Sequence, residues 1–494
     1  MDQRGKVVED HAIPLTQHKG IPMVVWLGMG RCWKFQILLM LWSGIRGLGI
    51  PTTGNNIIKG VKMKTIKTLF ASLAFLFLGL VPISAMGQSL PYTFTANTAA
   101  KASEVNANFQ YLLERFELRA TTIDCSNGSI QDALKEYNHI KVSGNCNQYV
   151  QIGLKGHQSS NQQQINRDFI FIEGLDPNKA TTISSSNIVV VDIDDTVTVH
   201  LKNLTISGTN QYALAVGRGA TLYAESLEVK NAQNGITVHD GGIAYLSDIT
   251  VSATSNAVLV TRNGTAKIYN NSLLQNSPGG LTVYYGSHAQ VDNSTINGNQ
   301  LGVYMKQASL DVYGSTISNN TDDGFLIHQN SSAEINNSNI LNNTRDGLTL
   351  RNGSQALVVN SVIDGSQSHG VYINANSVMQ TDNLTVKNSN HKNISLSDNS
   401  VLRFFSSTVE SDNETNLEIN TGSRVIAKGS NMNFSGSSAV KLYDRATLEV
   451  RSTSNSFSGT IACSNPANMG VSIVRNQTGS SWDNSSSPTT CPVH

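Results

Sequence analysis

The chain has 494 residues and is formally neutral, with 35 basic and 35 acidic side chains. This balance argues against a nucleic-acid-binding protein, which needs basic side chains to neutralise phosphates. Only 6% of residues are aromatic and 14% are charged, whereas glycine is abundant at 40 residues, which suits a turn-rich all-β protein.

Residues 1–62 show no coherent pattern, although they hold three of the four tryptophans. At Met63 a basic start is followed by an apolar core and a small-residue cleavage site, which predicts a signal peptide over 63–87. Codons for the residues just before Met63 can spell a bacterial ribosome-binding site, so we interpret 1–62 as upstream DNA translated in frame. The alternative is a membrane anchor within 22–42, whose apolar run is interrupted by charged residues that are costly in a bilayer.

Removing residues 1–87 changes the charge of the protein. That segment holds ten basic and three acidic residues, so the remainder carries 25 basic and 32 acidic side chains, net −7. We therefore predict an exported bacterial protein, secreted, periplasmic or on the cell surface. Neither a nucleic-acid partner nor stable membrane insertion after signal cleavage is expected.

Four cysteines remain, in two local pairs. Cys125 and Cys146 lie near the start of the repeat described below, and Cys463 and Cys491 lie near its end. An even, paired count in an exported chain predicts two disulfides that close the ends of the domain. A zinc site is the weaker alternative, because the spacings are long and no CxxC motif occurs.

The segment 88–120 is predicted to be a linker and an amphipathic helix. Val105, Phe109, Leu112 and Phe116 recur at helical spacing. The surrounding KASEVNANF stretch resembles a segment near the N-termini of secreted bacterial and phage-fibre-like proteins. One interpretation is that 99–117 joins three chains into a homotrimer, and the other is that the helix lies on its own domain.

A repeat with a period of about 22 or 23 residues, typical of solenoids, organises the chain from position 213 to position 460. Its units begin at Gly280, Gly302, Gly324, Gly347 and Gly370, among others. Each unit holds three short segments of alternating apolar residues, which predict strands, separated by Gly, Asn, Ser and Asp, which predict turns. Three strands per unit describe one coil of a parallel β-helix.

Upstream of the repeat, a short helical face at 130–134 is followed by a strand, a glycine turn and another strand. This order resembles the entry of pectin-lyase-like right-handed β-helices, in which a short helix caps the end of the solenoid. The resemblance covers 121–460 and implies an all-β, right-handed parallel β-helix with disulfide-closed ends. It implies no single activity, because the fold hosts lyases, hydrolases, epimerases, tailspikes and non-enzymatic surface proteins.

The register of the repeat predicts which residues lie side by side on adjacent coils although they are distant in the sequence. The outward position between the first two apolar residues of each unit and the position just after that strand form two rows down one sheet. Tyrosine, lysine, arginine and histidine gather in the middle of these rows, where aromatic faces can stack on sugars and cations can pair with acidic sugars. The predicted glycan-binding residues are Tyr284, Tyr304, Lys306, His328, Arg351 and Tyr372.

A second set precedes the leading glycine of three consecutive units. Asp323, Asp346 and His369 each lie one repeat apart, so they should stack on adjacent coils. Two close carboxylates would have separated pKa values, as a general acid and its partner do. With the Asp322-Asp323 pair, the set superficially resembles the polygalacturonase family, whose flanking motifs are absent. The alternative, which we favour, is that Asp-Gly and His-Gly are turn dipeptides entering a strand.

No cofactor is expected from the remaining motifs. Asp and Asn turns could hold Ca²⁺, but no GGxGxD nonapeptide, P-loop, GxSxG or HExxH occurs, and no metal ligands are assigned. Asn-rich turns are predicted to stack as side-chain ladders between coils. The repeat is lost in 461–494, which is predicted to be an irregular C-terminal cap.

Three functions follow from these patterns. The preferred one is an exported β-helix protein that binds polysaccharide or another cell-surface glycan along one exposed sheet without cleaving it. The second is a pectinase-like lyase or hydrolase that acts on acidic polysaccharide through the Asp/Asp/His stack. The third is an oligomeric, adhesin-like stalk.

Overall fold

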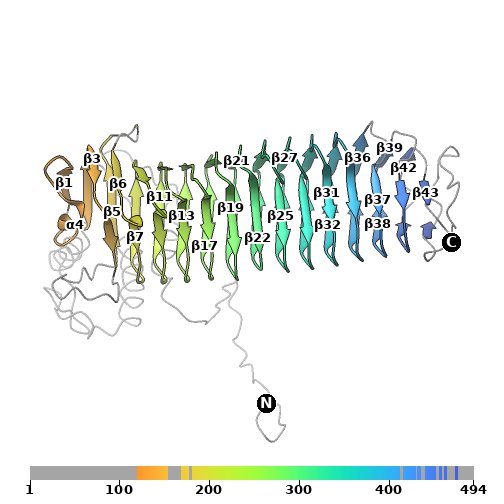
Figure 1. Cartoon of the computed structure of the whole chain (residues 1–494), viewed down its shortest axis with the longest axis horizontal. Coiled ribbons are helices and arrows are strands. Elements are labelled where there is room, and N and C mark those ends of the chain that lie inside the picture. Colours follow the sequence, from red (N-terminus) through yellow and green to blue (C-terminus); the bar gives the residue numbers. More distant parts are fainter. Residues whose placement is uncertain are drawn as a thin grey trace, which may run out of the picture. The chain divides into compact units, whose positions relative to one another are not determined.

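The computed structural model describes residues 120–153, 169–176, 178, 181–411, 416–429, 431–434, 440–451, 456–458, 461–463 and 473–476. They belong to one compact unit, Ala99–His494, and form coils of three short strands that stack in sequence order (Figure 1). The predicted upstream segment 1–62, the signal peptide 63–87, the helix within 88–120, Cys491 and most of the cap 461–494 lie outside the described residues.

Sheet A contains one strand from nearly every coil, and its neighbours pair in parallel. Its 16 strands are β1 (Ala120–Asp124), β2 (His139–Ser143), β5 (Phe169–Gly174), β8 (Thr198–Lys202), β11 (Thr221–Glu225), β14 (Ile243–Ser247), β17 (Thr265–Tyr269), β20 (His288–Asp292), β23 (Ser309–Tyr313), β26 (Ser332–Asn336), β29 (Gln355–Val359), β32 (Val378–Asp382), β35 (Val401–Phe405), β38 (Arg424–Lys428), β41 (Thr447–Val450) and β44 (Ile473–Asn476).

Sheet B follows sheet A in each coil and is also parallel. Its 14 strands are β3 (Asn145–Asn147), β6 (Thr182–Ser185), β9 (Thr205–Gly208), β12 (Glu228–Lys230), β15 (Thr250–Val251), β18 (Leu273–Gln275), β21 (Thr295–Asn297), β24 (Thr316–Ser318), β27 (Asn339–Leu341), β30 (Val362–Asp364), β33 (Thr385–Lys387), β36 (Thr408–Ser411), β39 (Asn431–Phe434) and β42 (Ser456–Ser458).

Sheet C completes each coil and carries the candidate sites. Its 14 parallel strands are β4 (Val150–Ile152), β7 (Val189–Ile193), β10 (Tyr212–Val216), β13 (Asn234–Val238), β16 (Asn256–Val260), β19 (Gly279–Tyr284), β22 (Leu301–Lys306), β25 (Phe325–His328), β28 (Leu348–Arg351), β31 (His369–Ile373), β34 (Lys392–Leu396), β37 (Leu417–Ile419), β40 (Val440–Leu442) and β43 (Ile461–Cys463).

The apolar residues of each strand fill the inside of the coils. In β25 the buried Phe325 pairs with Val303 on the preceding coil and with Leu348 on the next, so each pair spans one repeat of the sequence. Each fully buried side chain of this kind contributes roughly 1.5–3 kcal/mol. The predicted parallel β-helix, with one repeat of the sequence in each coil, is confirmed.

Asparagine and serine shape the turn between sheets A and B. Asn337 and Asn360 adopt left-handed backbone, with φ of 50° and 48°, which asparagine tolerates better than most residues. Next to them, the amide of Ser315 donates to Ser338 Oγ at 3.2 Å, and the amide of Ser338 donates to Ser361 Oγ at 3.1 Å. The predicted asparagine ladder occurs elsewhere, where buried Asn320 Nδ2 donates to Asn343 Oδ1 at 2.9 Å. The buried serine ladder was not predicted.

A helix and a disulfide close the first coil. Helix α4 (Ile130–Ala133) starts at Ser129, whose side chain accepts a hydrogen bond from the amide of Asp132, and it buries Ile130. Cys125 and Cys146 form a disulfide. The predicted cap helix and this predicted disulfide are confirmed, whereas the second pair cannot be described because Cys491 lies outside the described residues.

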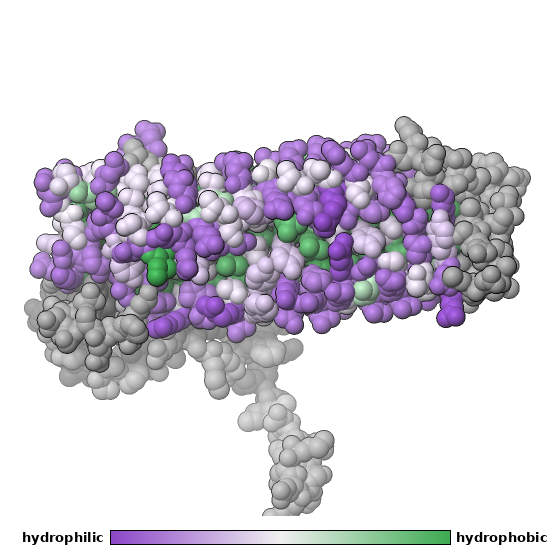
Figure 2. All heavy atoms as spheres, viewed as in Figure 1, coloured by the Kyte–Doolittle hydropathy of each residue, from purple (hydrophilic) through white to green (hydrophobic). Residues whose placement is uncertain are grey.

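The surface is mainly hydrophilic on the face drawn in Figure 2, with isolated hydrophobic residues along it. Over the described residues, the exposed large hydrophobic side chains are Leu175, Ile188, Tyr223 and Tyr285. Within this part of the chain, no helix has the length and apolar character of a membrane span.

Candidate functional site

Sheet C places the predicted glycan-binding residues on consecutive strands. In the first row Tyr304 pairs with Leu326, Leu326 with Thr349, and Thr349 with Tyr372. In the second row the register runs from Tyr284 through Lys306 and His328 to Arg351. Neighbouring strands lie about 4.8 Å apart, so each row presents one side chain per coil at that spacing.

The threonines of the first row are not exposed, although the row was predicted to face solvent. Thr282 is 2% exposed and Thr349 is fully buried. Their hydroxyls turn to neighbouring polar groups, with Thr282 Oγ1 donating to Asn256 Oδ1 at 2.7 Å and Thr349 Oγ1 to Asp346 Oδ2 at 3.2 Å. Neighbouring polar side chains therefore cover the threonines, and only the larger side chains of the first row reach the surface.

Aromatic rings flank the middle of the two rows. Tyr284 meets Tyr304 edge to face at 5.4 Å between centroids and lies 5.5 Å from Tyr285. Burial, followed by these two neighbours, raises the pKa of Tyr284 to about 12, so its hydroxyl remains a donor. Tyr285 is 48% exposed and was missed, because it falls in the turn after the strand where the repeat pattern ends.

Three basic side chains occupy consecutive coils between the tyrosines. We call Lys306, His328 and Arg351 the cationic row. Lys306 Nζ lies 5.6 Å from the ring centre of Tyr285, and the Arg351 guanidinium lies 5.4 Å from that of Tyr372. Burial, then the charges of Arg351 and Lys306, lower the pKa of His328.

The cationic row has no acidic partner among the described residues. Other basic residues of this sheet do have one, such as Lys392, whose Nζ lies 2.6 Å from Glu418 Oε1. The buried Nε of Arg351 also lacks a hydrogen-bond partner. The row therefore presents uncompensated positive charge to any ligand lying on the sheet.

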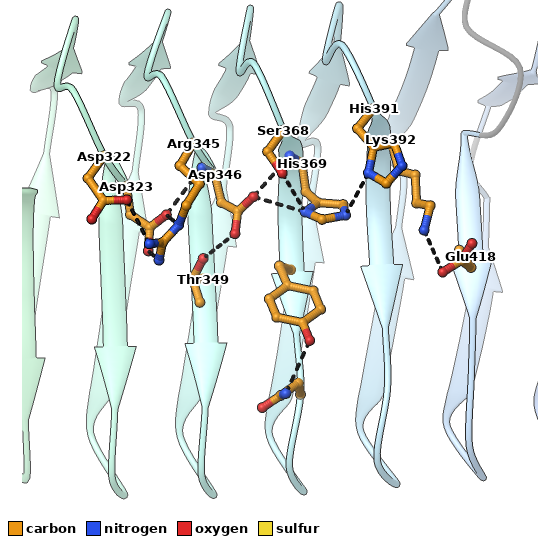
Figure 3. A network of polar contacts seen from close by, with 12 residues as sticks. Asp322, Asp323, Arg345, Asp346, Thr349, Ser368, His369, His391, Lys392 and Glu418 are labelled. Atoms are coloured by element: carbon orange, nitrogen blue, oxygen red, sulfur yellow. Dashed lines mark hydrogen bonds and ion pairs between the residues drawn. The ribbon is translucent and has the colours of Figure 1, made fainter.

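The Asp/Asp/His set lies on adjacent coils, as Figure 3 shows: Asp323 and Asp346 come just before strands β25 and β28, and His369 is the first residue of β31. Asp323 is fully buried and binds Arg345 through two hydrogen bonds, from Nε at 2.8 Å and Nη2 at 2.6 Å. It also accepts from the amide of Asp346 at 3.2 Å. Asp322 binds the same arginine, with Nη1 at 2.8 Å.

Asp346 repeats this arrangement one coil further. Its Oδ1 accepts from the amide of His369 at 3.0 Å and lies 2.9 Å from His369 Nδ1. The polar network continues through His391, whose Nδ1 is 3.3 Å from His369 Nε2 (Figure 3). Each carboxylate thus binds the backbone of the next coil, which is what a turn residue that joins coils would do.

Burial and hydrogen bonding separate the pKa values of the two carboxyl groups. Burial, then the charge of Asp346, raises the pKa of Asp323 to about 6 against the opposing effect of Arg345. For Asp346 burial acts in the same direction, but hydrogen bonds from the side chain and amide of His369 outweigh it and lower the pKa to about 2. The split resembles an acid–base pair, yet both residues are buried, at 0% and 3% exposed, and their carboxylate oxygens are already bound by Arg345, His369 and Thr349.

The lowered pKa of Asp346 predicts that the contribution of this residue to stability is lost in acid. An aspartate with an ordinary pKa of 3.8 that falls to about 2 on folding stabilises the protein above pH 3.8 and loses that contribution as pH falls through 2. We expect the free energy of unfolding of the wild type to fall by about 2 kcal/mol more than that of Asp346→Asn between about pH 4 and pH 2. Urea titrations across this range, with Asp311→Asn as a surface control, would measure it. Parallel curves for wild type and Asp346→Asn would contradict it.

Among the described residues, no group of three or more His, Cys, Asp or Glu is arranged to hold a metal ion.

Comparison with known proteins identifies one family model. Residues 187–332 and 256–390 match the model described as right handed beta helix region, which names no enzymatic activity. None of the curated proteins matches the sequence.

Several solved structures are similar to the chain, among them a glucanase and two tailspike proteins. The catalytic unit of the thermostable GH87 alpha-1,3-glucanase from Streptomyces thermodiastaticus strain HF3-3 shares 12% identity and a TM-score of 0.44, covering 74% of this chain and 70% of the other. The Dettilon tailspike protein (gp208) shares 9% identity with a TM-score of 0.34, and the match covers 79% of this chain and 72% of the tailspike. The Siphovirus 9NA tailspike receptor binding domain shares 11% identity with a TM-score of 0.29, and the match covers 71% of this chain and 78% of that domain. At these identities the similarity concerns the fold.

Proposed function

We propose that this right-handed parallel β-helix protein binds an acidic polysaccharide along sheet C without cleaving it. The observation that carries the proposal is the cationic row, Lys306, His328 and Arg351, which has no acidic partner among the described residues. A polyanion lying across the coils would meet one basic side chain per strand. Lys306 and Arg351 could each form a charge-assisted hydrogen bond to a carboxylate or sulfate, whereas His328, whose pKa is lowered, could bind it as a neutral imidazole.

The tyrosines at the two ends of the row supply the second element of glycan recognition. Tyr284 and Tyr285 lie on the coil before the row, Tyr304 shares strand β22 with Lys306, and Tyr372 lies on the coil after the row. Aromatic rings pack against the apolar faces of sugars, and tyrosine hydroxyls bind sugar hydroxyls. Together these contacts support a polymer rather than a free small anion, because they extend over several coils.

The Asp/Asp/His set supports binding over cleavage. A catalytic acid or base must come within hydrogen-bond reach of the substrate. Asp323 is fully buried and held by Arg345, and Asp346 is held by His369 and Thr349. We therefore propose that these residues hold adjacent coils together.

We also propose that the protein acts outside the cytoplasm. The disulfide between Cys125 and Cys146 supports this location, because such bonds persist in oxidising compartments. The signal peptide 63–87 and the homotrimer through 99–117 stay predictions, because both segments lie outside the described residues.

A panel of polysaccharides tests the proposed function. We expect the purified protein to bind polygalacturonate, alginate or a sulfated glycan but not dextran. Binding should weaken several-fold between about 0.05 and about 0.5 M NaCl, because salt screens exposed charges. No reducing ends or unsaturated uronates should form. Binding to none of the acidic polymers would refute the proposal, and product release that is lost in Asp346→Asn would replace it with the enzyme.

A further inference from the structure

A separate pocket opens on sheet C over strands β7, β10, β13 and β16, on coils that precede the cationic row. Its volume is about 330 Å³, within the range of roughly 300–1,000 Å³ typical of ligand pockets. Asp194, Thr237 and Arg218 line it together with the apolar side chains of Ala215 and Leu259. The pocket has room for a small ligand of the size of one or two sugar units.

Two polar atoms that line this pocket are buried without a hydrogen-bond partner. They are Asp194 Oδ1 and Thr237 Oγ1, in residues that are 4% and 3% exposed. Burial of such atoms without a partner costs free energy, and native proteins rarely leave them so. An acceptor and a hydroxyl that both lack a partner in one pocket point to a ligand that supplies the missing bonds.

A glycine creates the space between Asp194 and the next polar side chain of this row. Asp194, Gly217 and His239 lie at equivalent positions on three successive coils, since each follows directly on the paired residues Ile193, Val216 and Val238. A Cβ on Gly217 would lie 2.8 Å from Asp194 Oδ1 and 2.6 Å from His239 Cε1. Any larger residue at 217 would therefore fill the gap into which Asp194 points.

Three other charged residues of the pocket, Asp192, Asp240 and Arg262, already have side-chain partners. Asp192 Oδ2 accepts from the Tyr149 hydroxyl at 3.1 Å. Asp240 binds Arg262 through two hydrogen bonds of 2.6 and 3.0 Å. These pairs hold the walls of the pocket, and Asp194 and Thr237 are the buried groups in it that lack a hydrogen-bond partner.

We propose that this pocket binds one neutral sugar unit through its hydroxyl groups. A hydroxyl can donate to Asp194 Oδ1 and accept from Thr237 Oγ1, whereas a carboxylate would be repelled by Asp194. An ammonium group would be disfavoured by Arg218, which lines the same pocket. Ala215 and Leu259 provide an apolar floor for the C–H face of the ring. The inference does not rest on the cationic row.

Binding of simple glycosides by the full chain tests the proposal. The probes are methyl glycosides of neutral hexoses, with glucuronate and glucosamine for comparison, followed by saturation-transfer NMR and calorimetry. We expect a neutral hexoside to bind, about fivefold more weakly in Thr237→Val, which loses a hydrogen bond, and about tenfold more weakly in Asp194→Asn, which replaces a charge-assisted hydrogen bond by a neutral one. Thr295→Val, on sheet B, is the matched control and should bind like the wild type.

Stability measurements separate ligand binding from a structural role. Because Thr237 Oγ1 has no protein partner, Thr237→Val should keep or raise the midpoint of thermal unfolding while it weakens binding. A lowered midpoint would show that the hydroxyl serves the fold and would overturn the assignment. So would preferential binding of glucosamine or glucuronate, binding that both variants leave unchanged, or no binding of any neutral hexoside. Neutral-sugar binding that survives loss of Lys306 and Arg351 would show that this site and the cationic row are independent.

Discussion

Replacing Asp323 with alanine should lower the free energy of unfolding by about 3 kcal/mol, the low end of the cost of breaking a buried ion pair. The carboxylate is fully buried, and it accepts hydrogen bonds from two nitrogens of Arg345 and from the amide of Asp346. Its loss leaves that amide without a partner inside the stack. The cost stays near the low end because Arg345 is 42% exposed and can turn to solvent.

Asp322 offers a matched control for this change. It binds the same guanidinium, through Nη1 at 2.8 Å, but its side chain is 25% exposed. Asp322→Ala should therefore cost less than about 1 kcal/mol, as partly exposed ion pairs do. Urea unfolding followed by circular dichroism would compare the two variants, and hydrogen exchange would show whether strands β25 and β28 open first, as expected where each coil contacts only its neighbours. Equal effects of the two variants would mean that burial of Asp323 is not what stabilises this turn.

The arrangement of coils could be predicted because one period governs the chain. Once Val303, Phe325 and Leu348 are recognised as equivalent, their pairing on adjacent strands follows, and so do the rows on sheet C. The stack of Asp323, Asp346 and His369 follows from the same reasoning. Such predictions need only the path of the backbone. Each coil contains a nearly constant number of residues, and each lies one strand spacing further along the solenoid than the last.

Whether each side chain is buried, and which groups it contacts, could not be predicted in this way. Thr349 shares a row with Tyr372, yet it is buried because its hydroxyl bonds to Asp346, which depends on side-chain rotamers. Arg345 precedes Asp346 in the sequence, yet its side chain reaches Asp323 on the previous coil. The period places both residues but does not give their contacts.

The pocket near Asp194 was missed for a related reason. It depends on a missing side chain at Gly217, which lies between Asp194 and His239 in one row. Glycine is frequent throughout the repeat, so a glycine that opens a cavity looks the same in the sequence as one that permits a turn. Only the positions of the neighbouring atoms distinguish the two.

The double change Lys306→Ala/Arg351→Ala should weaken binding of the acidic polysaccharide about 100-fold. Each side chain can form a charge-assisted hydrogen bond worth about 1.5 kcal/mol, and the loss of two corresponds to about two powers of ten in the dissociation constant. The effect on the fold should be small, because neither side chain has an ion pair among the described residues and each loses only a cation–π contact worth about 0.5–1 kcal/mol. Calorimetric titration with the best polymer of the panel would measure the change.

The matched control removes the same number of positive charges from another sheet. Lys141 and Arg403 lie on strands β2 and β35 of sheet A, so Lys141→Ala/Arg403→Ala alters the net charge equally but leaves sheet C intact. If binding depended only on net charge, the two double variants would weaken it alike, and the cationic row would not be the site. A large loss confined to Lys306→Ala/Arg351→Ala, with a reduced salt dependence of the remaining affinity, would place the polyanion on the cationic row, because fewer contacts would then be open to screening.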